Sequence, residues 1–208
     1  MLEILTGAGL ATSAGLNAFI PMLALGLLDR FTSLVELPPA WAWLSSDVAL
    51  WTVGVLLVVE LVADKLPAID AFNDILQTVV RPAAGGITFA SGVGAETVTV
   101  QDPDSLLTGN AWVPIVVGAG IALVVHLTKA STRVAANTAT AGGAAPMLSA
   151  AEDLSAVTLV LAAIFLPVLV LVLILAVAAV LWGVYRRARA RARARRQGTG
   201  TAERPVVW

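Results

Sequence analysis

The apolar stretch "ALWTVGVLLVV", residues 49–59, is followed directly by "ELVADKLPAIDAFND", residues 60–74. The second stretch contains four carboxylates and one lysine, whereas the first contains no charge. Charged side chains are costly inside a bilayer, so they face the interior of a helix bundle, water or each other. The junction therefore predicts that a membrane helix ends here, with a charged cluster at the membrane edge.

The composition of the whole chain agrees with a lipid environment. Of its 208 residues, 58% are hydrophobic and 13% are charged, and the mean hydropathy is +0.88. Soluble domains contain about 25% charged residues, and a soluble fold of this composition would expose large apolar patches. Each crossing helix needs about 20 residues, so the length suits five or six helices. The absence of cysteine excludes disulfides, thiol catalysis and thiolate metal sites.

We expect an all-α, polytopic membrane helix bundle of about six transmembrane helices. Four apolar segments have the length and composition of spans: residues 5–28, 48–63, 112–127 and 154–185. We interpret the first as a retained helix, since no basic region precedes it and it is longer than the core of a signal peptide. Two weaker segments, 83–95 and 136–151, are rich in small residues that allow close helix packing. We interpret them as inner helices, broken at Gly85-Gly86 and at Gly142-Gly143.

The distribution of charge predicts the orientation. Residues 1–185 contain five Lys/Arg and 13 Asp/Glu, a net charge of −8, whereas residues 186–208 contain eight Arg and one Glu, a net charge of +7. Basic residues collect on the cytoplasmic side, so the seven arginines of Arg186–Arg196 place the C-terminus there. Six spans then place the N-terminus in the cytoplasm as well. We predict a transmembrane domain over 1–185 and a disordered cytoplasmic tail over 186–208, in a multi-pass protein of the inner membrane.

The basic tail has two interpretations, a topology anchor and a contact with anionic lipid through Arg186–Arg196. It alternates Arg with Ala, and no aromatic or base-reading residues accompany the arginines. We therefore expect the lipid bilayer as partner and no specific nucleic acid.

Two pairs of similar stretches indicate an internal repeat. "LVVEL" at 57–61 resembles "LVVHL" at 123–127, and "AAGGITFASGVGAE" at 83–96 resembles "TAGGAAPMLSAAED" at 140–153. They predict a duplicated helical hairpin. Parallel repeats occur in transporters, with sites at the repeat interface, and also where a hairpin has duplicated for packing. If the copies pack about a pseudo-two-fold axis, Glu60 and His126 face each other.

Glu60 and Asp64 are the first candidates for an ion site. They lie four residues apart, so both project from one face of a helix. One interpretation is a cation or proton site at an inner vestibule. The other is a set of structural charge pairs, in which Asp64 binds Lys65, Lys129 or Arg133 and Asp70 belongs to the same charged surface.

Three further polar residues are candidates for lining a path. His126, the only histidine, is suited to proton relay or is a hydrogen-bonded interior group. Asn17 precedes Pro21 by one turn, and this proline frees the carbonyl of residue 17 from its helical hydrogen bond. That arrangement suits either a substrate site or a packing kink. Asn137 lies in the small-residue segment "AANTATAGG".

No catalytic constellation is present in the sequence. It has no glycine-rich phosphate loop and no His pair at metal-binding spacing. We therefore expect no enzyme activity, no cofactor and no metal site.

Four stretches carry a family resemblance: "AGLNAFIPMLALGLLDRF", "LPPAWAWLSS", "VELVADKLPAIDAFNDILQTVVRPAAGGI" and "HLTKASTRVAANTATAGGAAPMLSAAEDLSAV". Together they resemble the bacterial integral-membrane family known as domain of unknown function 4126, over about residues 5–180. The resemblance implies a multi-helix inner-membrane protein. The family carries no established activity, so no catalytic residue is transferred.

Two hypotheses for function remain. The first is a small-solute or ion transporter or channel component, in which Glu60 and Asp64 bind or relay cations, His126 assists, and Asn17 and Asn137 line the path. The second is a non-transporting membrane scaffold or lipid-interacting protein. A water-filled cavity reaching Glu60 favours the first, and tightly paired carboxylates in a dry bundle favour the second. The small size of the bundle and its small-residue faces favour a homodimer.

Overall fold

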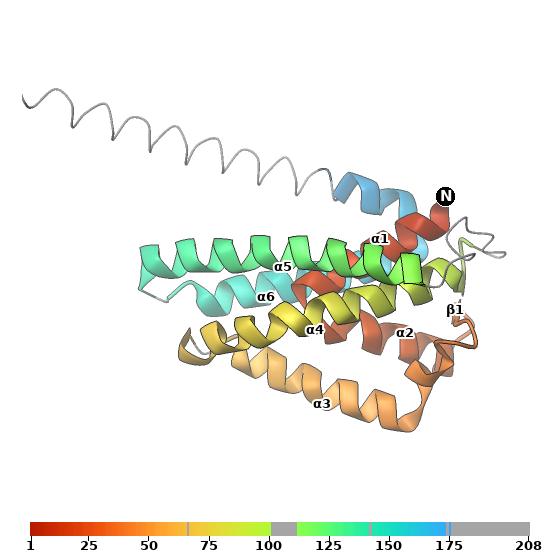
Figure 1. Cartoon of the computed structure of the whole chain (residues 1–208), viewed down its shortest axis with the longest axis horizontal. Helices are drawn as coiled ribbons and strands as arrows, with labels where there is room; N and C mark the ends of the chain where they lie inside the picture. Colours follow the sequence, from red (N-terminus) through yellow and green to blue (C-terminus); the bar gives the residue numbers. More distant parts are fainter. Residues whose placement is uncertain (66, 101–111, 142, 174, 176–208) are drawn as a thin grey trace, which may run out of the picture. The chain divides into compact units, whose positions relative to one another are not determined.

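The computed structural model describes residues 1–65, 67–100, 112–141, 143–173 and 175 (Figure 1). These residues are mostly helical, as expected. The elements are α1 (Leu2–Leu16), α2 (Phe19–Phe31), β1 (Val35–Glu36), the 3-10 helix η1 (Ala42–Ser45), α3 (Asp47–Ala63), α4 (Pro67–Gly94), β2 (Glu96–Thr97), α5 (Trp112–Thr140) and α6 (Ala145–Phe165).

The chain separates into two units, Met1–Val170 and Leu171–Trp208, and the description below concerns the first. The expected tail, 186–208, and the expected domain boundary at residue 185 lie outside the described residues.

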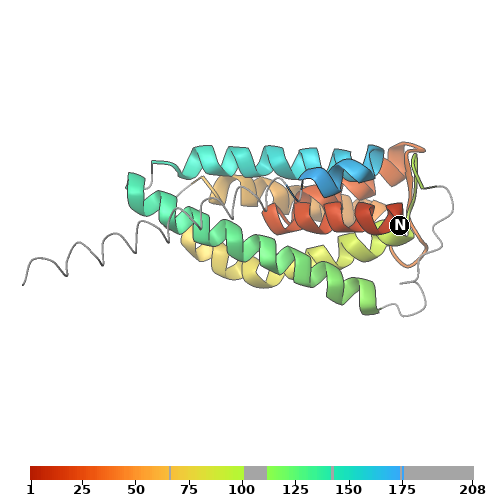
Figure 2. The same cartoon turned by 90° about the horizontal axis from the view of Figure 1, so that it is seen from above.

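The first expected span, 5–28, is wrong as a single helix, because the chain reverses at Asn17. Asn17 is extended, with φ −147° and ψ 119°, and separates helices of 15 and 13 residues. At 1.5 Å per residue these measure about 22 and 20 Å, so neither crosses a hydrocarbon core of about 30 Å alone. The outer ends of both helices lie at the same end of the bundle as β1 and β2 (Figures 1 and 2). The hydroxyl of Thr6, near the start of α1, accordingly donates to the carbonyl of Ala163 near the end of α6.

Helix α4 runs from Pro67 to Gly94, so the expected inner helix over 83–95 is the C-terminal part of a longer helix. The expected break at Gly85-Gly86 is wrong, because these glycines serve the packing of α4 on α5. A Cβ at Gly85 would lie 2.8 Å from the carbonyl oxygen of Gly118, and one at Gly86 would lie 2.8 Å from that of Ile115. The missing side chains let the two backbones approach closely without interrupting the helix.

The expected helix over 136–151 is also wrong. Helix α5 continues to Thr140, and α6 begins at Ala145 with Pro146 in its first turn. Ala141 in the intervening turn has a positive φ of 51°. Glycine after a helix and proline in the first turn of the next are stop and start signals, so this composition marks a turn. Likewise, α6 ends at Phe165, because the residue before Pro167 disfavours helical geometry. The expected helix over 154–185 is therefore interrupted.

The bundle has two ends, which we name by what lies there. The β end contains Met1 and the paired strands, in which Val35 pairs with Thr97. The turn end contains Lys65 and the turn between α5 and α6. Helix α4 packs against both α1 and α5, whereas α3 contacts mainly α2 and η1 at the periphery. Figure 2 shows the same helices from above.

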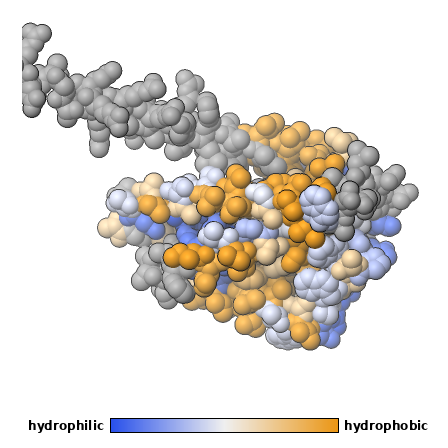
Figure 3. Space-filling model, viewed as in Figure 1, coloured by the Kyte–Doolittle hydropathy of each residue, from blue (hydrophilic) through white to orange (hydrophobic). Residues whose placement is uncertain are grey.

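Large apolar side chains remain on the surface of the bundle. On α3 only two residues are buried, Val53 and Glu60. The exposed large apolar side chains of α3 are Val48, Trp51, Val55, Leu56, Val58, Val59 and Val62. Hydrophobic residues cover much of the face shown in Figure 3. Within the described ranges, two helices, α5 over Trp112–Thr138 and α6, are long and apolar enough to cross a membrane.

Candidate functional site

Six charged side chains meet inside the bundle and form what we call the buried ion-pair network. They are Glu60 of α3, Asp64 at its C-terminal end, Arg81 of α4, Lys129 and Arg133 of α5, and Glu152 of α6. Five of them are at most 4% exposed, and the side chain of Glu152 is 15% exposed. Three acids face three bases, so the formal charges of the network cancel.

Asp64 lies at the centre of the network. Its Oδ2 is 3.1 Å from the Nζ of Lys129 and 3.1 Å from an Nη of Arg133. Its other oxygen, Oδ1, accepts a 2.8 Å hydrogen bond from the amide of Asn73. Burial opposes ionisation of this carboxyl, but its three cationic neighbours outweigh burial and hold the pKa of Asp64 below its ordinary value. Asp64 therefore remains an ionised anchor for α4 and α5.

Glu152 connects α6 to the same cations. Its carboxylate accepts hydrogen bonds from the Nε of Arg133 at 3.0 and 3.2 Å and contacts the Nη2 of that residue. It also lies 3.2 Å from the Nζ of Lys129. Lys129 and Arg133 are four residues apart, so they share one face of α5 and both reach the two carboxylates.

Glu60 is paired with Arg81. The Nη2 of Arg81 donates to Glu60 Oε1 at 2.8 Å. The Nη1 of the same guanidinium is 3.2 Å from His126 Nδ1 and 3.3 Å from the carbonyl oxygen of Gly15. Among the described residues, the buried polar atoms without a hydrogen-bond partner include Glu60 Oε2, Gln77 Oε1 and Arg81 Nε. Such groups mark places where water or another polar species is accommodated.

The break between α1 and α2 lies against this network. The last carbonyls of a helix lack intrahelical partners and carry partial negative charge. Here the carbonyl of Gly15 accepts from Arg81, and the carbonyl of Leu16 accepts from Lys129 at 2.8 Å. The tip of the helical hairpin is thus held by two buried cations.

At the tip, Asn17 accepts hydrogen bonds from backbone N–H groups at the start of α2. Its side-chain oxygen accepts from the backbone N–H groups of Phe19 and Ile20, at 3.1 and 3.2 Å. Its amide nitrogen donates to Asp153 Oδ1 at 3.0 Å. One side chain therefore caps α2 and ties the break to α6.

The structure sorts the predicted site residues into those at the network and those outside it. Glu60, Asp64, Lys129 and Arg133 belong to the network, and His126 contacts its member Arg81. Asn17 lies beside the network, where it bonds Asp153, the residue after Glu152. The ion pairs expected for Asp64 form with Lys129 and Arg133, whereas Lys65 is 3.9 Å from Asp153 and bonds the carbonyl of Leu61.

Glu60 and His126 meet through Arg81, which bonds both of them. Asn137 lies one turn beyond Arg133 on α5, with its oxygen buried and without a partner among the described residues. The side chain of Asp70 lies outside the described residues.

Three members of the site were not expected there: Arg81, Glu152 and Asp153. A signal for Arg81 was available, because Asn73, Gln77 and Arg81 recur every four residues and form a polar stripe on a helix. For Glu152 the signal was the turn composition of "AGGAAP", which returns the chain towards Arg133.

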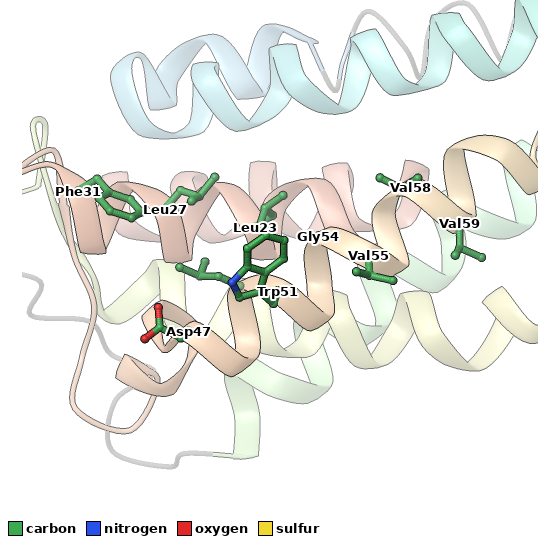
Figure 4. A pocket seen from close by; sticks show the side chains of 10 residues that line it. Leu23, Leu27, Phe31, Asp47, Trp51, Gly54, Val55, Val58 and Val59 are labelled. Atoms are coloured by element: carbon green, nitrogen blue, oxygen red, sulfur yellow. The ribbon is translucent and has the colours of Figure 1, made fainter.

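A groove of about 650 Å³ lies between α2 and α3, away from the network (Figure 4). Its lining includes Leu23, Leu27, Phe31 and Trp51, and Asp47 is its one charged member. None of the predicted site residues lines this groove. Its apolar walls suit hydrocarbon rather than a polar solute.

The carboxylates of the network are dispersed among cations rather than gathered together. In the part of the chain that the structure describes, no group of three His, Asp or Glu residues is arranged to hold a metal ion. The network consists of ion pairs, in which every carboxylate lies next to at least one cation.

Comparison with known proteins gives one assignment. No curated protein and no solved structure matches the chain. The family model described as "Domain of unknown function (DUF4126)" matches residues 4–187. Since this match covers most of the 208 residues and agrees with the resemblance seen in the sequence, the chain belongs to the DUF4126 family.

Proposed function

We propose that the protein is an integral membrane transporter or channel component for a small solute or ion, with the buried ion-pair network as its polar centre. The observation that carries this proposal is the helical hairpin α1–α2, whose broken tip meets Arg81 and Lys129. Discontinuous helices with their exposed backbone at a polar site are a recurrent feature of transporters. Buried ion pairs contribute little to stability in general, so six buried charges among apolar helices favour a functional role.

We assign the membrane topology from the same features. In this topology α3 to α6 cross the bilayer, and the hairpin enters from the β end and returns to it. The turn end carries Lys65, and we assign it to the cytoplasm because basic residues collect there. Met1 lies at the opposite end (Figure 1). This proposal therefore places the N-terminus on the outer side, in place of the cytoplasmic N-terminus expected from the sequence. Because α6 ends at the β end, the cytoplasmic C-terminus expected from Arg186–Arg196 requires one more crossing after Phe165. That C-terminus, the duplicated hairpin, the homodimer, the inner-membrane location and the lipid contact of Arg186–Arg196 stay predictions.

The roles of Glu60 and Asp64 differ from those of bare cation ligands. Both are already neutralised, Glu60 by Arg81 and Asp64 by Lys129 and Arg133. A solute or ion that enters must therefore compete with these pairs. Helix α3, which carries both carboxylates, buries only two of its side chains. Movement of α3 would exchange the partners of its carboxylates with little loss of apolar packing.

A scaffold is the second candidate, and one observation favours it. Each carboxylate of the network is paired with a cation, and the groove beside α3 is apolar. In a scaffold the network would only fix the hairpin tip to α4, α5 and α6. This alternative predicts that the charges are needed for stability but that no solute crosses the membrane.

A flux experiment separates the two candidates. The full chain would be reconstituted into proteoliposomes and screened with protons and with monovalent and divalent cations. We expect flux that is lost in Glu60→Gln and retained in Asp47→Asn, a matched acid-to-amide change on the same helix at a residue whose side chain is 78% exposed. Absence of flux for every solute, with a folded wild type, would support the scaffold.

The topology has its own test. The chain contains no cysteine, so single cysteines report one position each. Cysteines at Ser33 and Thr140, which lie at the β end and the turn end, should react with a membrane-impermeant maleimide from opposite sides of the membrane. Reaction of both from the same side would contradict the assigned topology.

A further inference from the structure

We propose that His126 is a proton-binding site and that Arg81 transmits its protonation to the hairpin tip, which makes the proton the coupling ion of the proposed transporter. The coupling of protons to transport rests on the proposed function. The proton-binding site itself depends only on the contacts of the His126 imidazole ring.

The contacts of His126 fix its protonation state. A guanidinium has donors only and no acceptor, so the contact of 3.2 Å between Arg81 Nη1 and His126 Nδ1 requires that Nδ1 carries no proton. The other nitrogen, Nε2, lies 3.1 Å from the hydroxyl of Thr78. That hydroxyl donates its own proton to the carbonyl of Asp74 at 2.9 Å, so it accepts from Nε2–H. The imidazole is therefore neutral, with its proton on Nε2.

A second proton can be added only at Nδ1. The resulting N–H would face the N–H of Arg81, so two donors and two positive charges would be opposed at hydrogen-bond distance. The hydrogen bond between Arg81 and His126 is therefore incompatible with the imidazolium. Proton uptake from solvent must separate the two side chains.

The surroundings of His126 set the direction of that movement. Three charged groups face the ring, Arg81 and Asp74 from α4 and Lys129 from its own helix α5. Glu60 of α3 reaches the ring through Arg81, and α1 presents the uncharged carbonyl of Gly15 to the same guanidinium. Arg81 would move towards the carboxylates, since Asp64 Oδ2 is already within 3.8 Å of its Nη2.

This movement reaches the hairpin tip. The Nη1 that bonds His126 also donates to the carbonyl of Gly15 at the end of α1. A shift of Arg81 therefore removes one of the two cations that hold the tip and leaves the other, Lys129 on Leu16. Protonation of one side chain is thus connected to the break between α1 and α2 by a single guanidinium.

The first experiment reads the tautomer by NMR. Because the chain has one histidine, ¹⁵N-histidine labelling of the full-length protein in lipid nanodiscs reports His126 alone. At pH 8 we expect one neutral species with its proton on Nε2. Arg81→Gln should convert it to a mixture of tautomers, and Arg30→Gln, at an arginine paired with Asp47, should leave it unchanged. A proton on Nδ1 in the wild type would overturn the proposal, even if Arg81→Gln fails to fold.

The second experiment reads the movement. Spin labels at Leu27→Cys on α2 and Val124→Cys on α5, both exposed positions, would be measured at pH 8 and pH 5. We expect the distance between the labels to change in the wild type and to stay constant in His126→Gln. A His126 that remains neutral at pH 5, or an imidazolium without any change in distance, would overturn the proposal. A proton-driven change in distance without flux would instead reject only the transporter.

Discussion

Replacement of Asp64 by asparagine tests whether the buried ion-pair network is as tightly connected as its geometry indicates. Asparagine keeps the shape of the side chain and a partner for Asn73 but removes the charge. Asp64 Oδ2 is 3.1 Å from each of two cations and 3.8 Å from a third. At an effective dielectric constant of about 20, Coulomb's law gives about 5 kcal/mol for one unit-charge pair at 3.1 Å.

Desolvation offsets much of that attraction, so the measured cost is smaller than the Coulomb energy. Removal of one partner from a buried pair typically costs about 3–5 kcal/mol. This corresponds to roughly a hundredfold to a few thousandfold in the unfolding equilibrium constant. The matched control is Asp47→Asn, whose ion pair with Arg30 is exposed and whose loss should cost below about 1 kcal/mol.

The assay is denaturant-induced unfolding in detergent, followed by the fluorescence of the six tryptophans. Asp64→Asn should lower the midpoint clearly more than Asp47→Asn. The double variant Asp64→Asn with Lys129→Gln should recover part of the loss, because it also removes a cation left unpaired. Equal stability of Asp64→Asn and Asp47→Asn would refute the reasoning.

Three further predictions follow from the same contacts. Gly85→Ala should destabilise the protein by about 1–3 kcal/mol through overpacking against α5. The control Gly120→Ala should be neutral or stabilising, because a Cβ at that position meets nothing within 4 Å. Equal thermal midpoints of the two variants would contradict the close approach of α4 and α5. Asn17→Ala should cost about 1–2 kcal/mol in thermal unfolding by removing the cap of α2, and an unchanged midpoint would show that the cap contributes nothing. Because the pKa of Asp64 is lowered, this residue contributes its full stabilisation above the ordinary pKa of 3.8 and loses it as the pH falls through the pKa in the folded state. Acid unfolding should therefore depend less on pH in Asp64→Asn than in the wild type. An identical pH profile of the two proteins would contradict this sign.

The helical class and the location of the charged cluster could be predicted from the sequence, because both depend on local composition. The end of α3 before Pro67 follows from the loss of hydropathy and from the proline. The pairing of Asp64 with Lys129 and Arg133 was one of the two interpretations of this residue, and Lys65 was a further expected partner. These features need no knowledge of how the helices are arranged.

The reversal at Asn17 could not be predicted from hydropathy, because residues 5–28 are as apolar as a single span. What decides it is the tertiary contact of two carbonyls with Arg81 and Lys129. Similarly, glycine pairs have two possible uses. Gly85-Gly86 allows close packing inside α4, whereas the pair at 142–143 lies in a turn followed by Pro146. Pro146 after the second pair is a local signal for a turn, whereas the role of Gly85-Gly86 depends on the neighbouring helix α5.

The position of the hairpin tip also has a consequence for biosynthesis. The hairpin leaves the ribosome before α4 and α5, so the groups that neutralise its tip, Arg81 and Lys129, are translated after it. Unsatisfied carbonyls cost several kcal/mol each in hydrocarbon. In the proposed topology, helices α1 and α2 therefore reach their final depth only after α5 has been inserted, so this hairpin matures later than the helices that follow it.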